Sequence, residues 1–192
     1  MKRLLTLILA LLLLAGCGTK EVPVEEEPEE TVTAETVTEE TEVHTFGAFS
    51  AQTLDGETLT EAIFEEADLT VVNLWATYCD PCKSEMPVLG MLDNELENVQ
   101  VLGIVLDSTD QNGNPDPAQV ELAIDLMEEA EADYTNLILN MELAMLGVAS
   151  VASVPATLFV DAEGNLVGQG FYGALNETQW RETIAERLEM AQ

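Results

Sequence analysis

The chain has 192 residues, with 37 aspartates and glutamates against 6 lysines and arginines, and a formal net charge of −31. Its length suits one domain with a tail. A surface this acidic repels nucleic acid and anionic lipid head groups, so we expect no nucleic-acid partner. The charge mainly serves solubility, and steering of a cationic partner is the weaker alternative.

Residues 1–16 have the pattern of a secretory signal peptide. Lys2 and Arg3 precede an apolar run that is shorter than the roughly 20 residues of a bilayer-spanning helix. The sequence LAGC, which ends at Cys17, resembles the lipobox of bacterial lipoproteins. This resemblance implies that Cys17 becomes the lipid-modified first residue of the mature protein. We therefore expect a lipid-anchored protein on the extracytoplasmic face of a bacterial cell membrane.

Residues 17–45 are predicted to form a disordered acidic linker that begins with the lipidated cysteine. They are rich in glutamate and threonine, and no helical or strand period would bury one face. His44 lies at the end of this linker, and we assign it no role. The folded domain is predicted to span residues 46–192.

The elements of this domain follow from periodicity and turn signals. Asp55-Gly56 between two short extended runs predicts an N-terminal β-hairpin. Apolar runs predict strands at residues 69–75, 101–106, 136–139, 156–161 and 166–170, the last two joined as a hairpin around Gly164. Capping residues and apolar spacing predict helices at residues 60–66, 81–97, 118–130, 141–146 and 177–190. This alternation indicates an α/β domain with a mixed sheet.

Two cysteines remain besides Cys17, namely Cys79 and Cys82 in the sequence WATYCDPCKSEMP. A zinc site would need four ligands, and the single histidine lies in the linker, so we expect no metal. A structural bridge between such near neighbours closes a very small loop and adds little stability. Placed between a buried strand and a helix N-terminus, the pair instead favours redox chemistry, in which the Cys79 thiolate attacks and Cys82 resolves.

The sequence VNLWATYCDPCKSEMP at residues 72–87 and the sequence SVPAT at residues 153–157 resemble the thioredoxin superfamily, in particular the TlpA/ResA-like tethered thiol–disulfide oxidoreductases. The resemblance covers about residues 46–190. It implies a thioredoxin fold, with a mixed central sheet flanked by helices, an N-terminal β-hairpin and an inserted strand and helix. It also implies a redox-active Cys79–Cys82 disulfide, no cofactor, and a cis peptide bond before Pro155, facing the disulfide. The residues that it places along the substrate groove are Trp75, Tyr78, Asp80, Pro81 and Val154.

Glu85, one turn after Cys82, matches an acidic residue of ResA-like proteins and is the candidate for proton handling. The alternative is a solvated acid in the first turn of the helix. Asn73 stands where thioredoxins often carry a buried aspartate, and it cannot titrate. Because Asp80 and Glu85 repel a thiolate, we expect a reductase whose potential is more negative than the value of about −120 mV typical of DsbA. Lys83 is the nearby cation and is predicted to be solvated.

The resemblance implies a function in which the protein, as a monomer, reduces disulfides of exported proteins, including cytochrome c apoprotein. Its electrons would come from a membrane thiol transporter of the CcdA or DsbD type. A peroxidase of the peroxiredoxin kind is one alternative, but Thr77 is two residues before Cys79 instead of three, and no arginine lies nearby. A copper-binding lipoprotein is another, but it would need a CxxxC spacing and a histidine in the fold.

Overall fold

The computed structural model of the protein describes residues 44–192. The predicted signal peptide, Cys17 and nearly all of the predicted linker lie outside these described residues. Within residues 44–192, no helix combines the length and the apolar character needed to cross a membrane.

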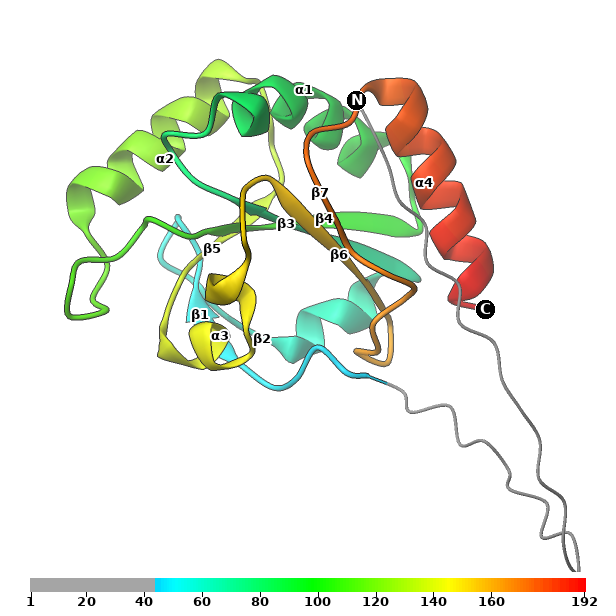
Figure 1. The fold of residues 1–192 in the computed structure, drawn as a ribbon, viewed down its shortest axis with the longest axis horizontal. Coiled ribbons are helices and arrows are strands. Elements are labelled where there is room, and N and C mark those ends of the chain that lie inside the picture. The colour runs from blue at the N-terminus through cyan, green and yellow to red at the C-terminus, as the bar shows by residue number, and fades with distance from the viewer. Residues whose placement is uncertain (1–43) are drawn as a thin grey trace, which may run out of the picture. The chain divides into compact units, whose positions relative to one another are not determined.

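The centre of the domain is a mixed sheet (Figure 1). Its strands are β3 (Leu69–Trp75), β4 (Val99–Val105), β5 (Thr135–Ile138), β6 (Ala156–Asp161) and β7 (Phe171–Tyr172). They lie in the order β5-β4-β3-β6-β7. β3, β4 and β5 are parallel, whereas β6 is antiparallel to β3, and β7 is antiparallel to β6. The predicted mixed α/β sheet of a thioredoxin fold is confirmed.

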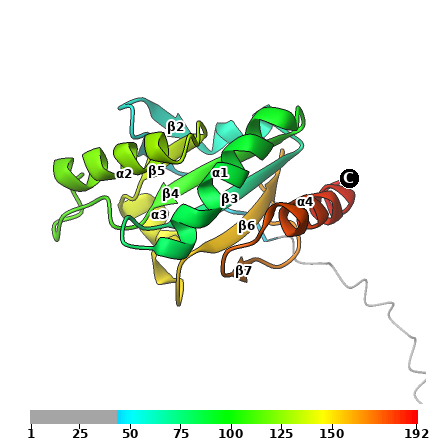
Figure 2. The same ribbon diagram turned by 90° about the horizontal axis from the view of Figure 1, so that it is seen from above.

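Helices cover both faces of this sheet (Figures 1 and 2). One face carries α1 (Asp80–Glu95), α2 (Pro117–Glu129) and α4 (Glu177–Met190). The other face carries the 3-10 helices η1 (Glu61–Glu66) and η2 (Val148–Ser150), α3 (Met141–Met145), and the hairpin of β1 (Ser50–Gln52) and β2 (Thr58–Thr60). Each face has its own cluster of buried apolar side chains. Both faces of the sheet are therefore covered by apolar side chains.

β3 lies in the middle of the sheet and is buried at every position. Val71 and Trp75 belong to the cluster beneath α1, whereas Val72 and Leu74 belong to the cluster on the opposite face. Burial on both faces explains why this strand is a continuous apolar run instead of an alternating one. The polar residues of this strand are Thr70 and Asn73, of which Asn73 is 1% exposed and lies in the centre of the domain.

The N-terminal hairpin and the predicted insertion are both present. β1 and β2 pair antiparallel, and Gly56 in the turn has a φ of +88°, which glycine adopts without strain. The helix predicted over residues 60–66 is the 3-10 helix η1, capped by Thr60. Between Cys82 and Pro155 the chain forms β4, α2, β5, α3 and η2, which accommodates the extra strand and helix expected there.

The predicted strand over residues 166–170 is wrong. Leu166 makes a single bridge with Val160, and regular pairing resumes only at β7. Gly168 has a φ of +63°, which turns the backbone out of the extended conformation. Gly170 then passes so close to β6 that an added Cβ would lie 2.5 Å from the carbonyl oxygen of Thr157. The glycines thus delay the pairing with β6.

His44 and Thr45, which fall in the predicted linker, are already paired with the domain. The backbone N–H of Leu166 donates to the carbonyl oxygen of His44 at 2.7 Å, and Thr45 bridges Asn165. Both partners follow Asp161, which pairs with the first residue of β3. The chain therefore enters the domain at the end of the sheet where β3 begins.

Candidate active site

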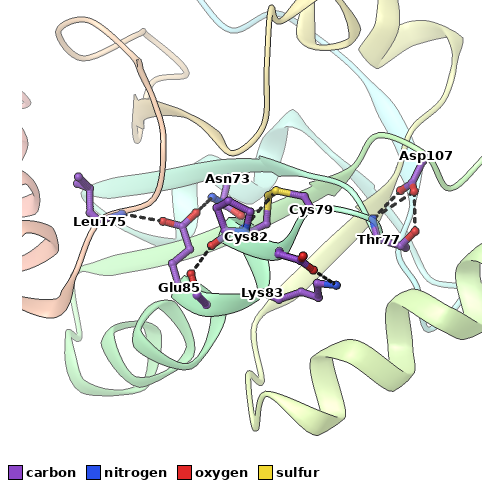
Figure 3. The surroundings of a disulfide bond; sticks show 11 residues. Asn73, Thr77, Cys79, Cys82, Lys83, Glu85, Asp107 and Leu175 are labelled. Atoms are coloured by element: carbon purple, nitrogen blue, oxygen red, sulfur yellow. Dashed lines mark hydrogen bonds and ion pairs between the residues drawn. A yellow bond between two sulfur atoms is a disulfide. The ribbon is translucent and has the colours of Figure 1, made fainter.

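A disulfide joins Cys79 and Cys82 where β3 passes into α1 (Figure 3). Cys79 is the N-cap of α1, and its Sγ accepts a hydrogen bond from the backbone N–H of Cys82 at 3.2 Å. The exposed fraction is 5% for Cys79 and 0% for Cys82. Because a helix N-terminus and an N–H donor stabilise a thiolate, Cys79 has the geometry of the attacking thiol. Cys82 is the more enclosed of the two.

The peptide bond between Val154 and Pro155 is cis, as predicted. β6 begins directly after Pro155, and its first residue, Ala156, pairs with Leu74 of β3. This register places Pro155 level with Trp75, at the end of the sheet that carries the disulfide. Pro155 is buried and Val154 is half-buried.

Glu85 lies one turn after Cys82 and is 1% exposed. Asn73 Nδ2 donates to Glu85 Oε1 at 3.0 Å, and the backbone N–H of Leu175 donates to Glu85 Oε2 at 3.2 Å (Figure 3). Burial raises the pKa of Glu85 to about 7, because desolvation outweighs these hydrogen bonds to the carboxylate. The alternative of a solvated first-turn acid is wrong, and the carboxyl can exchange a proton near neutral pH.

The exposed surface beside the disulfide is formed by Tyr78, Asp80 and Pro81, with Tyr78 exposed to 74%. Lys83 Nζ pairs with Asp80 Oδ1 at 2.7 Å. The hydrogen bond and the charge of Lys83 hold the pKa of Asp80 below its ordinary value. Lys83 is partly exposed and also pairs with Asp80, so it partly neutralises the acid between the two cysteines.

The sequence model of the AhpC/TSA family matches residues 44–169. The chain is 30% identical to the thiol:disulfide interchange protein DsbE of Pseudomonas fluorescens biotype C over 145 residues, which are 75% of this chain and 74% of DsbE. The chain belongs to the thioredoxin-fold thiol–disulfide oxidoreductases of this family. The predicted enzyme class is thereby confirmed.

Two further similarities accord with this placement of the oxidoreductase. A stretch of 42 residues, 21% of this chain and 22% of the relative, is 43% identical to the thiol-disulfide oxidoreductase ResA of Oceanobacillus iheyensis. The solved structure of a thiol:disulfide interchange protein of the thioredoxin family from Chlorobium tepidum TLS is similar with a TM-score of 0.62 and 19% identity, over 76% of this chain and 97% of that one. At this identity the second similarity supports the fold alone.

Trp75 does not line a substrate groove in this oxidoreductase, contrary to the prediction. Its side chain is 0% exposed, and its Nε1 donates to Asn136 Oδ1 at 2.7 Å. The alternation of β3 places Trp75 on the same face as Val71, beneath α1, so the ring points into the core. Tyr78 is the aromatic residue that remains exposed beside the disulfide.

Asp107, which follows β4, fixes the loop before Cys79, and the sequence analysis missed it. Its Oδ2 accepts a hydrogen bond from Thr77 Oγ1 at 2.6 Å, and its Oδ1 accepts one from the Thr77 backbone N–H at 3.0 Å (Figure 3). Parallel strands bring their carboxyl ends to one edge, so a polar residue directly after the second strand could have been found. Leu175 gave no such signal, because it contacts Glu85 through its backbone.

Tyr134 is another buried titratable group of the oxidoreductase. Its side chain is 6% exposed, and its hydroxyl has no hydrogen-bond partner among the described residues. Burial, and then the charges of Glu85 and Asp93, raise the pKa of Tyr134 far above its usual range, so it stays neutral near pH 7. Across residues 44–192, no three His, Cys, Asp or Glu side chains are arranged to hold a metal ion.

Proposed function

We propose that this oxidoreductase is a dithiol reductase that works outside the cytoplasm on disulfides of exported proteins. Its candidate client is cytochrome c apoprotein, as for the ResA-like proteins that it resembles. The observation that carries the proposal is the buried carboxyl of Glu85, with a pKa of about 7, one turn from a thiol pair at a helix N-terminus. Such a group can take up and release a proton at the pH at which thiols exchange.

In the reduced protein, the Cys79 thiolate attacks one sulfur of the client disulfide. A bond forms between that sulfur and Cys79 Sγ, the client disulfide breaks, and the released client thiolate takes a proton from solvent. Cys82 then gives its thiol proton to the Glu85 carboxylate, and its sulfur attacks Cys79 Sγ. The Cys79–Cys82 disulfide forms and the second client thiolate leaves, so two electrons pass from protein to client.

Electrostatics support the reductase direction. A stabilised thiolate makes a thiol pair oxidising, whereas a destabilised thiolate makes it reducing. The helix N-terminus stabilises the Cys79 thiolate, but an ionised and buried Glu85 repels a second negative charge. Asp80 repels the Cys79 thiolate less, because Asp80 is exposed to water and paired with Lys83. We expect the buried carboxylate to dominate, and a midpoint potential more negative than about −120 mV, the value typical of DsbA.

The direction is tested with a peptide that carries two cysteines as a disulfide in the spacing CxxCH. The Cys82→Ser variant should accumulate a mixed disulfide with this peptide, because Cys79 can attack and nothing resolves the product. The matched Cys79→Ser variant should accumulate none. Trapping by both variants, or a midpoint potential near about −120 mV in glutathione buffers, would contradict a reductase with Cys79 as its nucleophile.

The lipid anchor and the electron donor are part of the same proposal. The lipobox that ends at Cys17 supports attachment to the outer face of the cell membrane, where a thiol transporter of the CcdA or DsbD type would re-reduce the Cys79–Cys82 disulfide. A Cys17→Ala variant should leave the membrane fraction. Retention of that variant in the membrane would count against the anchor, without touching the chemistry of the thiols.

A further inference from the structure

Trp180 lies near the start of α4, and its side chain is 0% exposed. Its Nε1 is buried and has no hydrogen-bond partner among residues 44–192. The other buried indole, that of Trp75, does have one, because its Nε1 donates to Asn136 Oδ1 at 2.7 Å. A buried N–H without an aligned acceptor is costly, so the surroundings of Trp180 Nε1 require an explanation.

The ring of Trp180 is held firmly in place. Asn176 is the N-cap of α4, so Leu175 and Trp180 occupy the positions before the cap and in the fourth helical place, whose side chains pack together in a hydrophobic staple. Both side chains join the apolar cluster beneath α1. Phe171 of β7 also packs on the indole, with ring centroids 5.6 Å apart. The indole therefore has little freedom to turn toward a distant acceptor.

The acceptor beside this staple is the carboxyl of Glu85. The backbone N–H of Leu175 donates to Glu85 Oε2 at 3.2 Å, so the start of α4 already contacts this group (Figure 3). Burial raises the pKa of Glu85 to about 7, and the N–H groups of Leu175, Asn73 and Trp180 oppose that rise. The Trp180 N–H thus lies close to the carboxyl, without the alignment of a full hydrogen bond.

We propose that Trp180 is a positioning residue whose indole N–H stabilises the carboxylate of Glu85 and so keeps this side chain ready to take the proton of Cys82. An N–H dipole interacts more strongly with a carboxylate than with a neutral carboxyl, so the stabilisation is largest while Glu85 is ionised. It requires no rearrangement of the site. The inference rests on the proposed function, in which Glu85 receives the proton of Cys82, but its test needs no client.

The other titratable groups around Glu85 are quiet near pH 7 in the oxidised protein. Cys79 and Cys82 do not titrate while they form the disulfide. Tyr134 stays neutral because burial raises its pKa. Burial, and less so the charge of Asp133, raise the pKa of Asp93 further along α1, which makes Asp93 the carboxyl to control for. The charged side chains nearer the surface form ion pairs, namely Lys83 with Asp80, and Arg181 with Glu95 and Glu177.

The first test uses the unaltered chain. It contains two tryptophans, so its NMR spectrum carries two indole N–H signals, and Trp75 serves as the control for Trp180. In the oxidised protein, from about pH 5 to about pH 9, the Trp180 signal should move downfield with the midpoint of the Glu85 carboxyl carbon, while the Trp75 signal stays constant. A Trp180 signal that stays constant while Glu85 titrates, or that moves equally in Glu85→Gln, overturns the proposal.

The second test removes the indole N–H and keeps an aromatic ring. Trp180→Phe should raise the Glu85 midpoint by about half a pKa unit, because the ionised state loses a donor. Water entering the vacated space would lower the midpoint instead, so the sign separates the two causes. Trp75→Phe is the matched control and should leave the Glu85 midpoint unchanged, while Asp93→Asn should leave the Trp180 response in place.

The proposal on Trp180 is overturned if Trp180→Phe does not raise the Glu85 midpoint relative to Trp75→Phe. If Trp180→Phe does not fold, the indole titration of the unaltered chain decides alone. Normal trapping by Cys82→Ser together with a failed indole response would remove the role of Trp180 and leave the proposed function. Failed trapping with the expected indole response would remove the proposed function and leave the interaction between Trp180 and Glu85.

Discussion

The disulfide lies between two regions that treat charge in opposite ways. The rim is formed by Tyr78, Asp80 and Lys83 at the surface, and the floor by the buried side chains of Asn73 in β3 and Glu85 in α1. At the rim, Lys83 lowers the pKa of Asp80, whereas on the floor burial raises the pKa of Glu85 to about 7. Two carboxyls within one helical turn of a cysteine therefore differ because water and a cation reach only one of them.

This difference identifies which acid can influence the thiols. A charge at the rim is screened by water and salt and is shared with its partner, so its effect at the sulfur atoms is small. A charge on the floor is screened much less. The number of acidic residues near a CxxC pair is thus a poor guide to its chemistry, and their burial is a better one.

The largest effect that separates the two regions should be on folding stability. The pKa of Glu85 is about 7 in the folded protein against an ordinary 4.5, so the folded state binds more protons than the unfolded state between these values. The contribution of Glu85 to the free energy of unfolding should be fully present below about pH 4.5. It should be lost, by about 3 kcal/mol, as the pH rises through about 7. Glu85→Gln should remove this fall, as measured by urea unfolding of the oxidised protein at several pH values.

Asp80→Asn is the matched control for that experiment, because it removes a carboxylate at the rim from the same turn of helix. It should leave the pH dependence above about pH 5 as in the unaltered protein. If both variants weakened the pH dependence of stability equally, burial of Glu85 would not be the cause of that dependence.

A smaller contrast is expected in the reactivity of the thiols. In the reduced protein, Glu85→Gln should lower the apparent thiol pKa by about one unit, because it removes a buried charge that repels the thiolate. Asp80→Asn should lower it by less than about a third of a unit. Iodoacetamide alkylation rates followed against pH measure both, and shifts of the same size would contradict the distinction between rim and floor.

The smallest effect concerns the ion pair at the rim. Lys83→Met should let the pKa of Asp80 rise toward its ordinary value, since both causes of the lowering come from Lys83. The thermal unfolding midpoint should not change measurably, because exposed pairs contribute little. An NMR titration of the Asp80 carboxyl with parallel melting curves checks this, and Lys83→Arg should keep the pair. A large loss of stability would assign Lys83 a role that its exposure does not suggest.

The sequence predicted local features of this site well and long-range ones poorly. β3 follows from a mainly apolar run, α1 from Pro81 in its first turn, and α4 from Asn176, which forms a capping box with Gln179. The cis bond before Pro155 came from the family resemblance. These features depend on residues close to one another in the chain.

The failures concern contacts that only the folded chain creates. Glu85 was expected near the thiols, but its burial depends on Leu175 and α4, far along the chain. Trp75 was placed along the substrate groove by the family resemblance, whereas its Nε1 donates to Asn136 Oδ1 and its ring lies in the core. The strand predicted over residues 166–170 is absent, and regular pairing begins only at β7. This shift depends on Gly168, whose φ of +63° no spacing rule revealed.

His44 and Thr45 pair near the start of β3, whereas the disulfide follows the end of β3. The two places are therefore separated by about the length of this strand, about 20 Å. In the proposed function, a client therefore approaches the end of the domain opposite His44, where the described chain begins. If the proposed lipid anchor holds the chain, attachment and thiol exchange would take place at opposite ends of the domain. Under that proposal, shortening or lengthening the segment before His44 would change how far the active site reaches, while the chemistry at Cys79 stays the same.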